Sequence, residues 1–160
     1  MFFTKKISKK TFSIIVLVSI LLIMLVLRFT ACGFKKTTAE SITMGTYTLL
    51  AGSNESCIDF LSQFGWTADN EPAEVEDVKI PMEFNETFNE YNELQRQQGL
   101  DLANYKGKVC QRRSYNITNY GTDTQVKANL LVYNGVVIGG DICSVELDGF
   151  MHTFDDKTKE

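Results

Sequence analysis

The sequence predicts a small α+β domain of two layers, an antiparallel β-meander with one or two packed helices, preceded by one transmembrane or signal helix. Apolar residues recur at helical spacing in two segments, residues 54–64 and 81–99. From Val109 onward the apolar residues follow strand patterns, and Asn134-Gly135 lies between two apolar runs as the turn of a hairpin. An apolar run of 16 residues, 12–27, lies near the amino terminus.

The amino-terminal residues have the composition of a membrane anchor or an export signal. Four lysines in residues 1–10 precede the apolar run, and Arg28 follows it. A membrane span takes about 20 residues, so the anchor is expected over residues 11–31. Because lysine and arginine favour the cytoplasmic side, we expect residues 1–10 inside and the remainder of the chain outside the cytoplasm.

Three fates fit this segment, and each places the folded domain outside the cytoplasm: an uncleaved anchor, a lipoprotein signal and a cleaved secretory signal. Phe29-Thr-Ala-Cys32 resembles a bacterial lipobox, which makes Cys32 a candidate for lipidation. Phe29 stands where that motif prefers leucine, and Arg28 precedes the motif directly. The predicted localisation is the cell membrane, as a single-pass or lipid-anchored protein.

The charge distribution disfavours nucleic-acid binding. Five of the 16 basic residues lie within residues 1–28, which contain no acidic residue, so the chain after Arg28 has 11 basic and 20 acidic residues and a net charge of −9. An acidic domain repels phosphate backbones. The basic residues Lys106, Lys108 and Arg112-Arg113 are interpreted as a solvated strand edge or loop.

The chain organisation follows from these patterns. We expect a basic cytoplasmic segment (1–10), the anchor or lipoprotein signal (11–31), a linker (32–43), an extracytoplasmic α+β domain (44–154) and a flexible tail (155–160).

The first half of the domain alternates strands and helices. Residues 44–51 are predicted to be a strand, and residues 54–64 a helix with Asn54 as its N-cap and Gly65 as its terminator. A short strand is expected over 74–80. The second helix is opened by Pro81 and ends near Gly99. It carries an aromatic stripe that is interpreted as core, with a peptide or ligand groove as the less favoured alternative: Phe84, Phe88, Tyr91 and Leu94.

The second half is predicted to be strands over residues 114–120, 125–133 and 136–143. A two-residue turn at Asn134-Gly135 pairs Tyr133 with Val136, Leu131 with Ile138 and Val126 with Cys143 if no bulge intervenes. Gly139-Gly140 indicates a bulge or a close approach of another backbone, because glycine within a strand often marks such a position.

Several segments carry a resemblance to a known family: Phe60-Leu-Ser-Gln-Phe-Gly-Trp66, Ile80-Pro81 with Tyr91-Asn-Glu-Leu-Gln95, Gln98-Gly-Leu-Asp-Leu102, Tyr105-Lys-Gly-Lys108, Leu131 to Ser144, and Leu147-Asp-Gly-Phe-Met-His152. Over about residues 55–154 the chain resembles uncharacterised proteins of Clostridia-type Firmicutes, a domain of unknown function carried behind a signal or membrane anchor. The resemblance implies an extracytoplasmic Gram-positive protein. It transfers no functional residue, because the family has no assigned activity.

Metal and cofactor sites are not expected. His152 is the only histidine, and no cysteine pair has zinc-ligand spacing. If Cys32 is lipidated or at the membrane boundary, three cysteines remain, so at most one disulfide can form among them. Cys57 and Cys143 are interpreted as small buried hydrophobic residues.

Three hypotheses describe the function. One is a non-catalytic interaction module that docks an unknown protein of the cell envelope. The second is a domain that binds a peptide or small ligand in a tyrosine-lined pocket, with Tyr91, Tyr105, Tyr115, Tyr120 and Tyr133 as candidates. The least favoured is a thiol-dependent enzyme using Cys143 and His152, with Asp141 and Asp148 nearby.

Overall fold

The computed structural model describes residues 15–23, 36–121 and 123–156. The chain divides into two compact units, residues 1–35 and 36–160, and each is described by itself.

The first unit contains a helix over residues 15–23 whose apolar side chains are exposed. The rest of the anchor expected at 11–31, the basic segment 1–10 and Cys32 lie outside the described residues. Within the described part of the chain, no helix combines the length and the hydropathy needed to cross a bilayer.

The second unit is an α+β domain built on an antiparallel meander. Strands β1 and β2 form a small sheet, and β3 to β7 form a five-stranded sheet in chain order. The elements are β1 Thr38–Ser41, β2 Gly45–Thr48, α2 Asn54–Gln63, β3 Glu74–Lys79, α3 Glu86–Gln97, the 3-10 helix η1 Leu102–Tyr105, β4 Val109–Ile117, β5 Val126–Tyr133, β6 Val136–Ser144 and β7 Met151–His152.

Local capping decides where the two helices begin. Ser53, rather than Asn54, caps α2, since its hydroxyl accepts from the Ser56 N–H and the Ser56 hydroxyl accepts from the Ser53 N–H. Gly65, with a φ of 77°, follows the helix as predicted. The second helix begins at Glu86, later than the expected Pro81, because Asn85 caps it.

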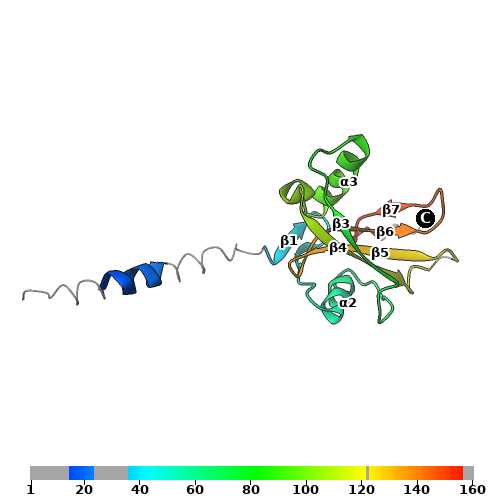
Figure 1. Cartoon of the computed structure of the whole chain (residues 1–160). Helices are drawn as coiled ribbons and strands as arrows, with labels where there is room; N and C mark the ends of the chain where they lie inside the picture. Colours follow the sequence, from blue (N-terminus) through cyan, green and yellow to red (C-terminus); the bar gives the residue numbers. More distant parts are fainter. Residues whose placement is uncertain (1–14, 24–35, 122, 157–160) are drawn as a thin grey trace, which may run out of the picture. The chain divides into compact units, whose positions relative to one another are not determined.

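The two helices lie on opposite faces of the large sheet, so the domain has three layers where two were expected (Figure 1). Tyr115 of β4 donates to Asn54 of α2 at 2.9 Å. The adjacent Ser114 points to the other face, where Tyr91 of α3 donates to Asp141 at 2.9 Å. The uninterrupted burial of residues 136–142 in β6 reflects this double coverage.

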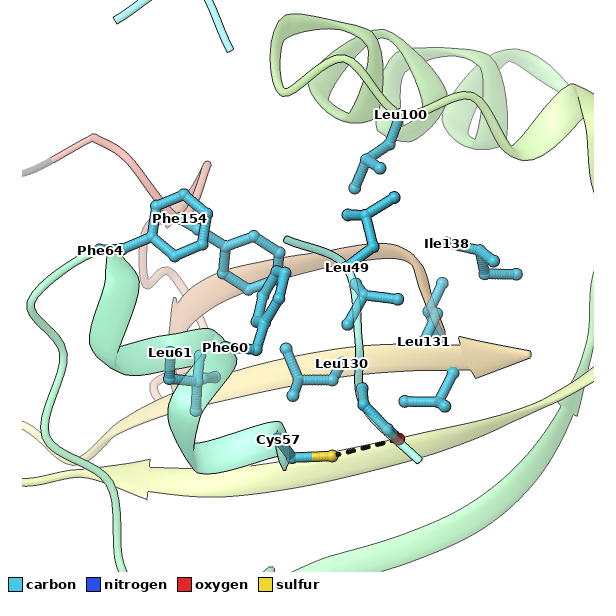
Figure 2. Packing of buried hydrophobic residues seen from close by; sticks show 14 of the residues in the cluster. Leu49, Cys57, Phe60, Leu61, Phe64, Leu100, Leu130, Leu131, Ile138 and Phe154 are labelled. Atoms are coloured by element: carbon cyan, nitrogen blue, oxygen red, sulfur yellow. Dashed lines mark hydrogen bonds between the residues drawn. The ribbon is translucent and has the colours of Figure 1, made fainter. Parts of the chain in front are cut away.

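The hydrophobic core gathers between α2 and the sheet. Phe60 of α2 and Phe64, which caps the end of that helix, approach Phe154, with ring centroids 5.1 and 5.5 Å away, respectively. Figure 2 shows these rings close to Leu61 and Leu130, all of them buried. Apolar burial at about 25 cal/mol per Å² makes this cluster the main source of stability.

The β5–β6 hairpin confirms the predicted turn and corrects the predicted register. Asn134 and Gly135 have φ values of 51° and 78°, as a type I′ turn requires, and Tyr133 pairs with Val136. A bulge between Leu131 and Val132 then shifts the ladder by one residue. Leu131 therefore pairs with Gly139 instead of Ile138, and Val126 with Ser144 instead of Cys143.

Two buried glutamines complete the edge of β6 that faces away from β5. Gln95 accepts from the Gly140 N–H at 2.7 Å, and Gln98 donates to the Gly140 carbonyl at 3.1 Å. Gln98 also accepts from the Phe154 N–H at 2.8 Å. On the same edge, Val137 N–H donates to the Leu49 carbonyl at 2.8 Å. Side-chain amides thus take the place of a neighbouring strand at Gly140.

Described residues of the expected linker and of the expected tail form regular structure or hydrogen bonds. Residues 38–41, placed in the linker, form β1. Asp155, placed in the flexible tail, accepts hydrogen bonds from Ser41 and Thr43 in the β1–β2 hairpin. Burial would raise the pKa of Asp155, but the hydrogen bonds from Ser41, Thr153 and Thr43 outweigh it and hold the pKa below its usual value.

We predict that Gly140→Ala lowers the free energy of unfolding by about 3 kcal/mol or more. A Cβ at this position, where φ is 154°, would collide with the Asn129 carbonyl and the Phe154 ring. Chemical denaturation of the full chain measures the loss. Gly45→Ala is the matched control, because its φ is 75° but nothing lies within 4 Å, so about 1 kcal/mol is expected. Equal losses for the two variants would contradict this role of Gly140.

We predict that Asp155→Asn destabilises the domain by about 1 kcal/mol at pH 7, since the carboxylate is partly exposed. Folding lowers the pKa of Asp155, so the ionised carboxylate stabilises the folded state at any pH above the pKa that Asp155 has in the unfolded chain. This stabilisation is lost as the pH falls through the lower pKa that Asp155 has in the folded protein. The difference between wild type and variant should therefore vanish in the acid range below about pH 4. Thermal unfolding from pH 3 to 7 tests it, with the exposed Asp59→Asn as control. A difference that is independent of pH would refute the contact.

Candidate functional site

A row of polar side chains crosses the sheet on the face that α3 covers. The register aligns Ser114 of β4 with Asn129 of β5, and Asn129 with Asp141 of β6. Ser114 donates to the Asn129 side-chain oxygen at 2.7 Å, and Asn129 Nδ2 donates to Asp141 Oδ2 at 2.9 Å. Because residues directly opposite each other share a face, strand pairing itself assembles this network.

Asp141 is the centre of the network and is only 2% exposed. Its two oxygens accept from Tyr91 and Asn129, which suits an ionised carboxyl group. Burial raises the pKa of Asp141, while the hydrogen bonds from Asn129 and Tyr91 oppose the shift. Burial and the Asp141 charge also raise the pKa of Tyr91 well above its usual value, so its hydroxyl remains a donor.

Cys143 lies two residues beyond Asp141 on the same face and is half-buried. Asn129 Nδ2 lies 3.3 Å from its sulfur. Burial, followed by the Asp141 charge, raises the pKa of Cys143 to about 11. Since the thiolate is the nucleophilic form, the environment of Cys143 suppresses nucleophilic chemistry at neutral pH.

Arg112 is the cation that acts on this network from β4. Its Nη2 lies 2.9 Å from Glu76 and 3.5 Å from Glu74, two carboxylates of the edge strand β3. The Nε atom is buried without a hydrogen-bond partner. Arg112 favours the charged form of Asp141, but the ion pairs of Arg112 are made with glutamates, and within the described residues Asp141 has no ion pair.

A groove of about 630 Å³ adjoins the network between α3 and β7. Tyr91 belongs to both, since its ring lines the groove and its hydroxyl binds Asp141. Most of the lining surface is apolar, and Asn85, Thr87 and Glu90 add polar groups. The lining residues are Asn85, Thr87, Phe88, Glu90, Tyr91, Leu94 and Met151. This combination of an apolar hollow with a few polar groups is typical of binding sites.

The structure brings Asp141 and Cys143 together but separates His152 from them. His152 pairs with Ile142, whereas Cys143 pairs with Met151, so the imidazole and the thiol lie on opposite faces. The His152 ring lies 2.9 Å from the Tyr120 hydroxyl and stacks on Phe150. Asp148 lies in the exposed turn before β7. A thiol–imidazole pair is therefore not formed.

The tyrosines of the expected pocket are distributed over the domain. Tyr91 lines the groove, whereas Tyr115 contacts α2 on the other face. Tyr105 and Tyr133 pack against each other at 5.7 Å, and Tyr120 stacks on Trp66 at 5.6 Å. One tyrosine thus remains at the candidate site, where Phe88 and Leu94 of the stripe interpreted as core also line the groove, together with Met151.

The cysteines within the described residues, Cys57, Cys110 and Cys143, are free thiols. Cys57 is fully buried, and Arg113 donates to its sulfur at 3.2 Å. The described part of the chain contains no cluster of histidine, cysteine or carboxylate side chains suited to hold a metal ion.

Ser114 and Asn129 were missed in the sequence because neither belongs to a motif. One signal was available. Asp141 interrupts a run of apolar and glycine residues, 136–142, and a carboxyl group buried in such a strand requires hydrogen-bond donors. Which residues supply them depends on strand register, which the bulge altered.

We predict that iodoacetamide alkylates Cys143 at pH 7 roughly two orders of magnitude more slowly than an ordinary cysteine, whose pKa is about 8.5. The rate should rise up to about pH 11, where the thiol ionises. Peptide mapping by mass spectrometry measures the rate in the full chain, with the denatured chain as reference. Rapid labelling with a midpoint below pH 8 would instead indicate an activated thiol.

Comparison with known proteins adds a family but no activity. The family model described as a domain of unknown function, DUF4830, matches residues 60–142, which is more than half of the chain. The match runs from the last turn of α2 through most of β6 and therefore includes Tyr91, Asn129 and Asp141. No curated protein and no solved structure matches the chain. The chain belongs to the DUF4830 family.

Proposed function

We propose that residues 36–156 form a non-catalytic binding module of the cell envelope, which takes an apolar side chain of an extended protein segment into the groove between α3 and β7. The groove carries this proposal. At about 630 Å³ it lies within the size range of ligand sites, and Phe88, Leu94 and Met151 supply apolar walls.

The position of β7 favours an extended segment as the ligand. β7 is the last strand of the sheet, and it has two residues. Phe150 directs its carbonyl toward β6, where it accepts from the Ser144 N–H at 3.1 Å. Because backbone direction alternates along a strand, Met151 directs its N–H and carbonyl away from β6. An added strand can pair with these groups while its side chain enters the groove.

Two observations favour binding over thiol catalysis. The pKa of Cys143 is raised to about 11, so the thiol is protonated at neutral pH. His152, the expected base, faces the opposite side of the sheet. Binding needs neither group.

The amino-terminal composition supports a location at the membrane. Lysines before an apolar run, with the domain after it, are the pattern of a protein held at the outer side of the membrane. The proposal includes both an uncleaved anchor over 11–31 and a lipid anchor at Cys32.

Methyl NMR of the full chain in lipid nanodiscs tests the groove. Met151 lines it, whereas Met44 and Met82 are exposed elsewhere on the domain and serve as internal controls. We predict that the neutral peptide acetyl-Thr-Leu-Ser-Gln-amide shifts the Met151 methyl signal saturably, with Kd in the millimolar range, because burying one leucine contributes about 2 kcal/mol. The peptide acetyl-Thr-Ser-Ser-Gln-amide should not.

Leu94→Trp fills the groove and should weaken binding at least about tenfold. Val75→Ser, an exposed position on β3, is the matched control and should bind like wild type. If no peptide shifts the Met151 signal, or if Leu94→Trp binds normally, the groove is not the binding site.

A further inference from the structure

We propose that the groove selects segments in which a basic residue accompanies the apolar one, so that the partner of this domain is a cationic, extended protein segment. This inference rests on the proposed binding function and specifies the chemistry of the ligand. It comes from the charges around the groove.

Two carboxylates at the groove lack a basic partner. Glu90 lines the groove, and Asp141 lies beneath it, bound to the Tyr91 hydroxyl. Within the described residues, neither has a lysine or arginine nitrogen within 4.0 Å. The contrast with other acids is clear, since Glu93 pairs with Arg96 at 3.1 Å and Glu76 with Arg112 at 2.9 Å.

The nearby cations do not cancel this field. The charge of Arg112 favours the ionised form of Asp141, but Arg112 forms its ion pairs with Glu74 and Glu76. Lys127, which pairs with Cys143 across the strands, adds one positive charge. Lys106 lies over the ring of Phe84, which packs on the groove residue Phe88, and adds a third cation. The four carboxylates Glu90, Asp141, Glu74 and Glu76 still exceed the three cations, so the balance is negative. Asp141 is 2% exposed, so its charge acts more strongly than it would on an open surface, whereas Glu90 is exposed and water and salt screen its charge.

Strand geometry places the expected basic residue. Side chains two positions apart on an extended chain point to the same side, about 7 Å apart. A segment paired with β7 that places a leucine in the groove therefore presents the residue two positions away along the same side, next to α3. A lysine there can approach Glu90, and its charge interacts favourably with Asp141 below.

The test compares three peptides that differ in one residue: acetyl-Thr-Leu-Ser-Lys-amide, its Gln form and its Glu form. The Met151 methyl signal of the full chain in neutral-lipid nanodiscs gives each Kd. We expect the Lys peptide to bind about fivefold more tightly than the Gln peptide, and the Glu peptide more weakly than both. The preference should shrink between 20 and 500 mM NaCl, because salt screens exposed charges.

Variants identify the source of the preference. Glu90→Gln should reduce the Lys-over-Gln ratio at least about twofold, and adding Asp141→Asn should bring the ratio close to one. Thermal unfolding checks that both variants fold. Glu55→Gln on α2 is the matched control, because it changes the net charge equally but lies on the opposite face of the sheet.

The outcomes separate the two proposals. If all three peptides bind equally, the groove remains a binding site and the selection of cations is refuted. If the Glu55→Gln control loses the preference as Glu90→Gln does, overall charge and not the groove attracts the peptide, and this inference is again refuted. If no peptide shifts Met151, the proposed binding function itself fails.

Discussion

The pairing of two glutamine side chains with the backbone of Gly140 is the interaction on which the rest of the domain depends. Gln95 and Gln98 saturate both backbone groups of Gly140 on the open edge of β6, and Gln98 also binds the Phe154 N–H. The Tyr47 hydroxyl donates to the Gln98 carbonyl at 2.6 Å. One end of α3 is therefore tied to the sheet, to the small hairpin and to the carboxyl-terminal segment. All the groups are buried, so breaking one leaves an unsatisfied partner.

The hydrogen bonds of Gln95 and Gln98 to Gly140 fix the position of α3 on the sheet, and the groove follows from that position. The carboxyl end of the helix is held at β6, while Tyr91, one turn earlier, reaches Asp141. The first turns of α3 extend past the short strand β7, which covers only two residues of β6. The space that remains between the helix and Met151 is the groove. A longer β7 would extend the sheet beneath these turns of the helix.

The candidate site contains a buried charged group, which lowers the stability of the folded domain relative to an apolar side chain at the same position. The carboxyl group of Asp141 is buried and has no ion pair with another described residue, and it lies next to the half-buried thiol of Cys143 and the apolar groove. Burying a charge is unfavourable, and hydrogen bonds compensate for part of this cost. Tyr91 and Asn129 donate to Asp141, and Ser114 donates to Asn129. Asparagine at position 141 would keep most of these hydrogen bonds at less cost. A negative charge beneath a binding groove is consistent with a ligand that carries the opposite charge.

The sequence by itself determined the features that depend on near neighbours. Asn134-Gly135 specifies a type I′ turn because both residues tolerate positive φ, and the apolar periods specify two helices and a meander. Tertiary structure decided the rest. The bulge at Ile138, the side of the sheet that each helix covers and the partners of Asp141 depend on contacts such as Gln98 to Gly140, 42 residues apart. Residue types and their spacing do not show which of these distant residues will pair, because the residues contact each other only when the chain is folded. Cys143 and His152 are close in sequence, but the β6–β7 register pairs Cys143 with Met151, so the two side chains lie on opposite faces of the sheet.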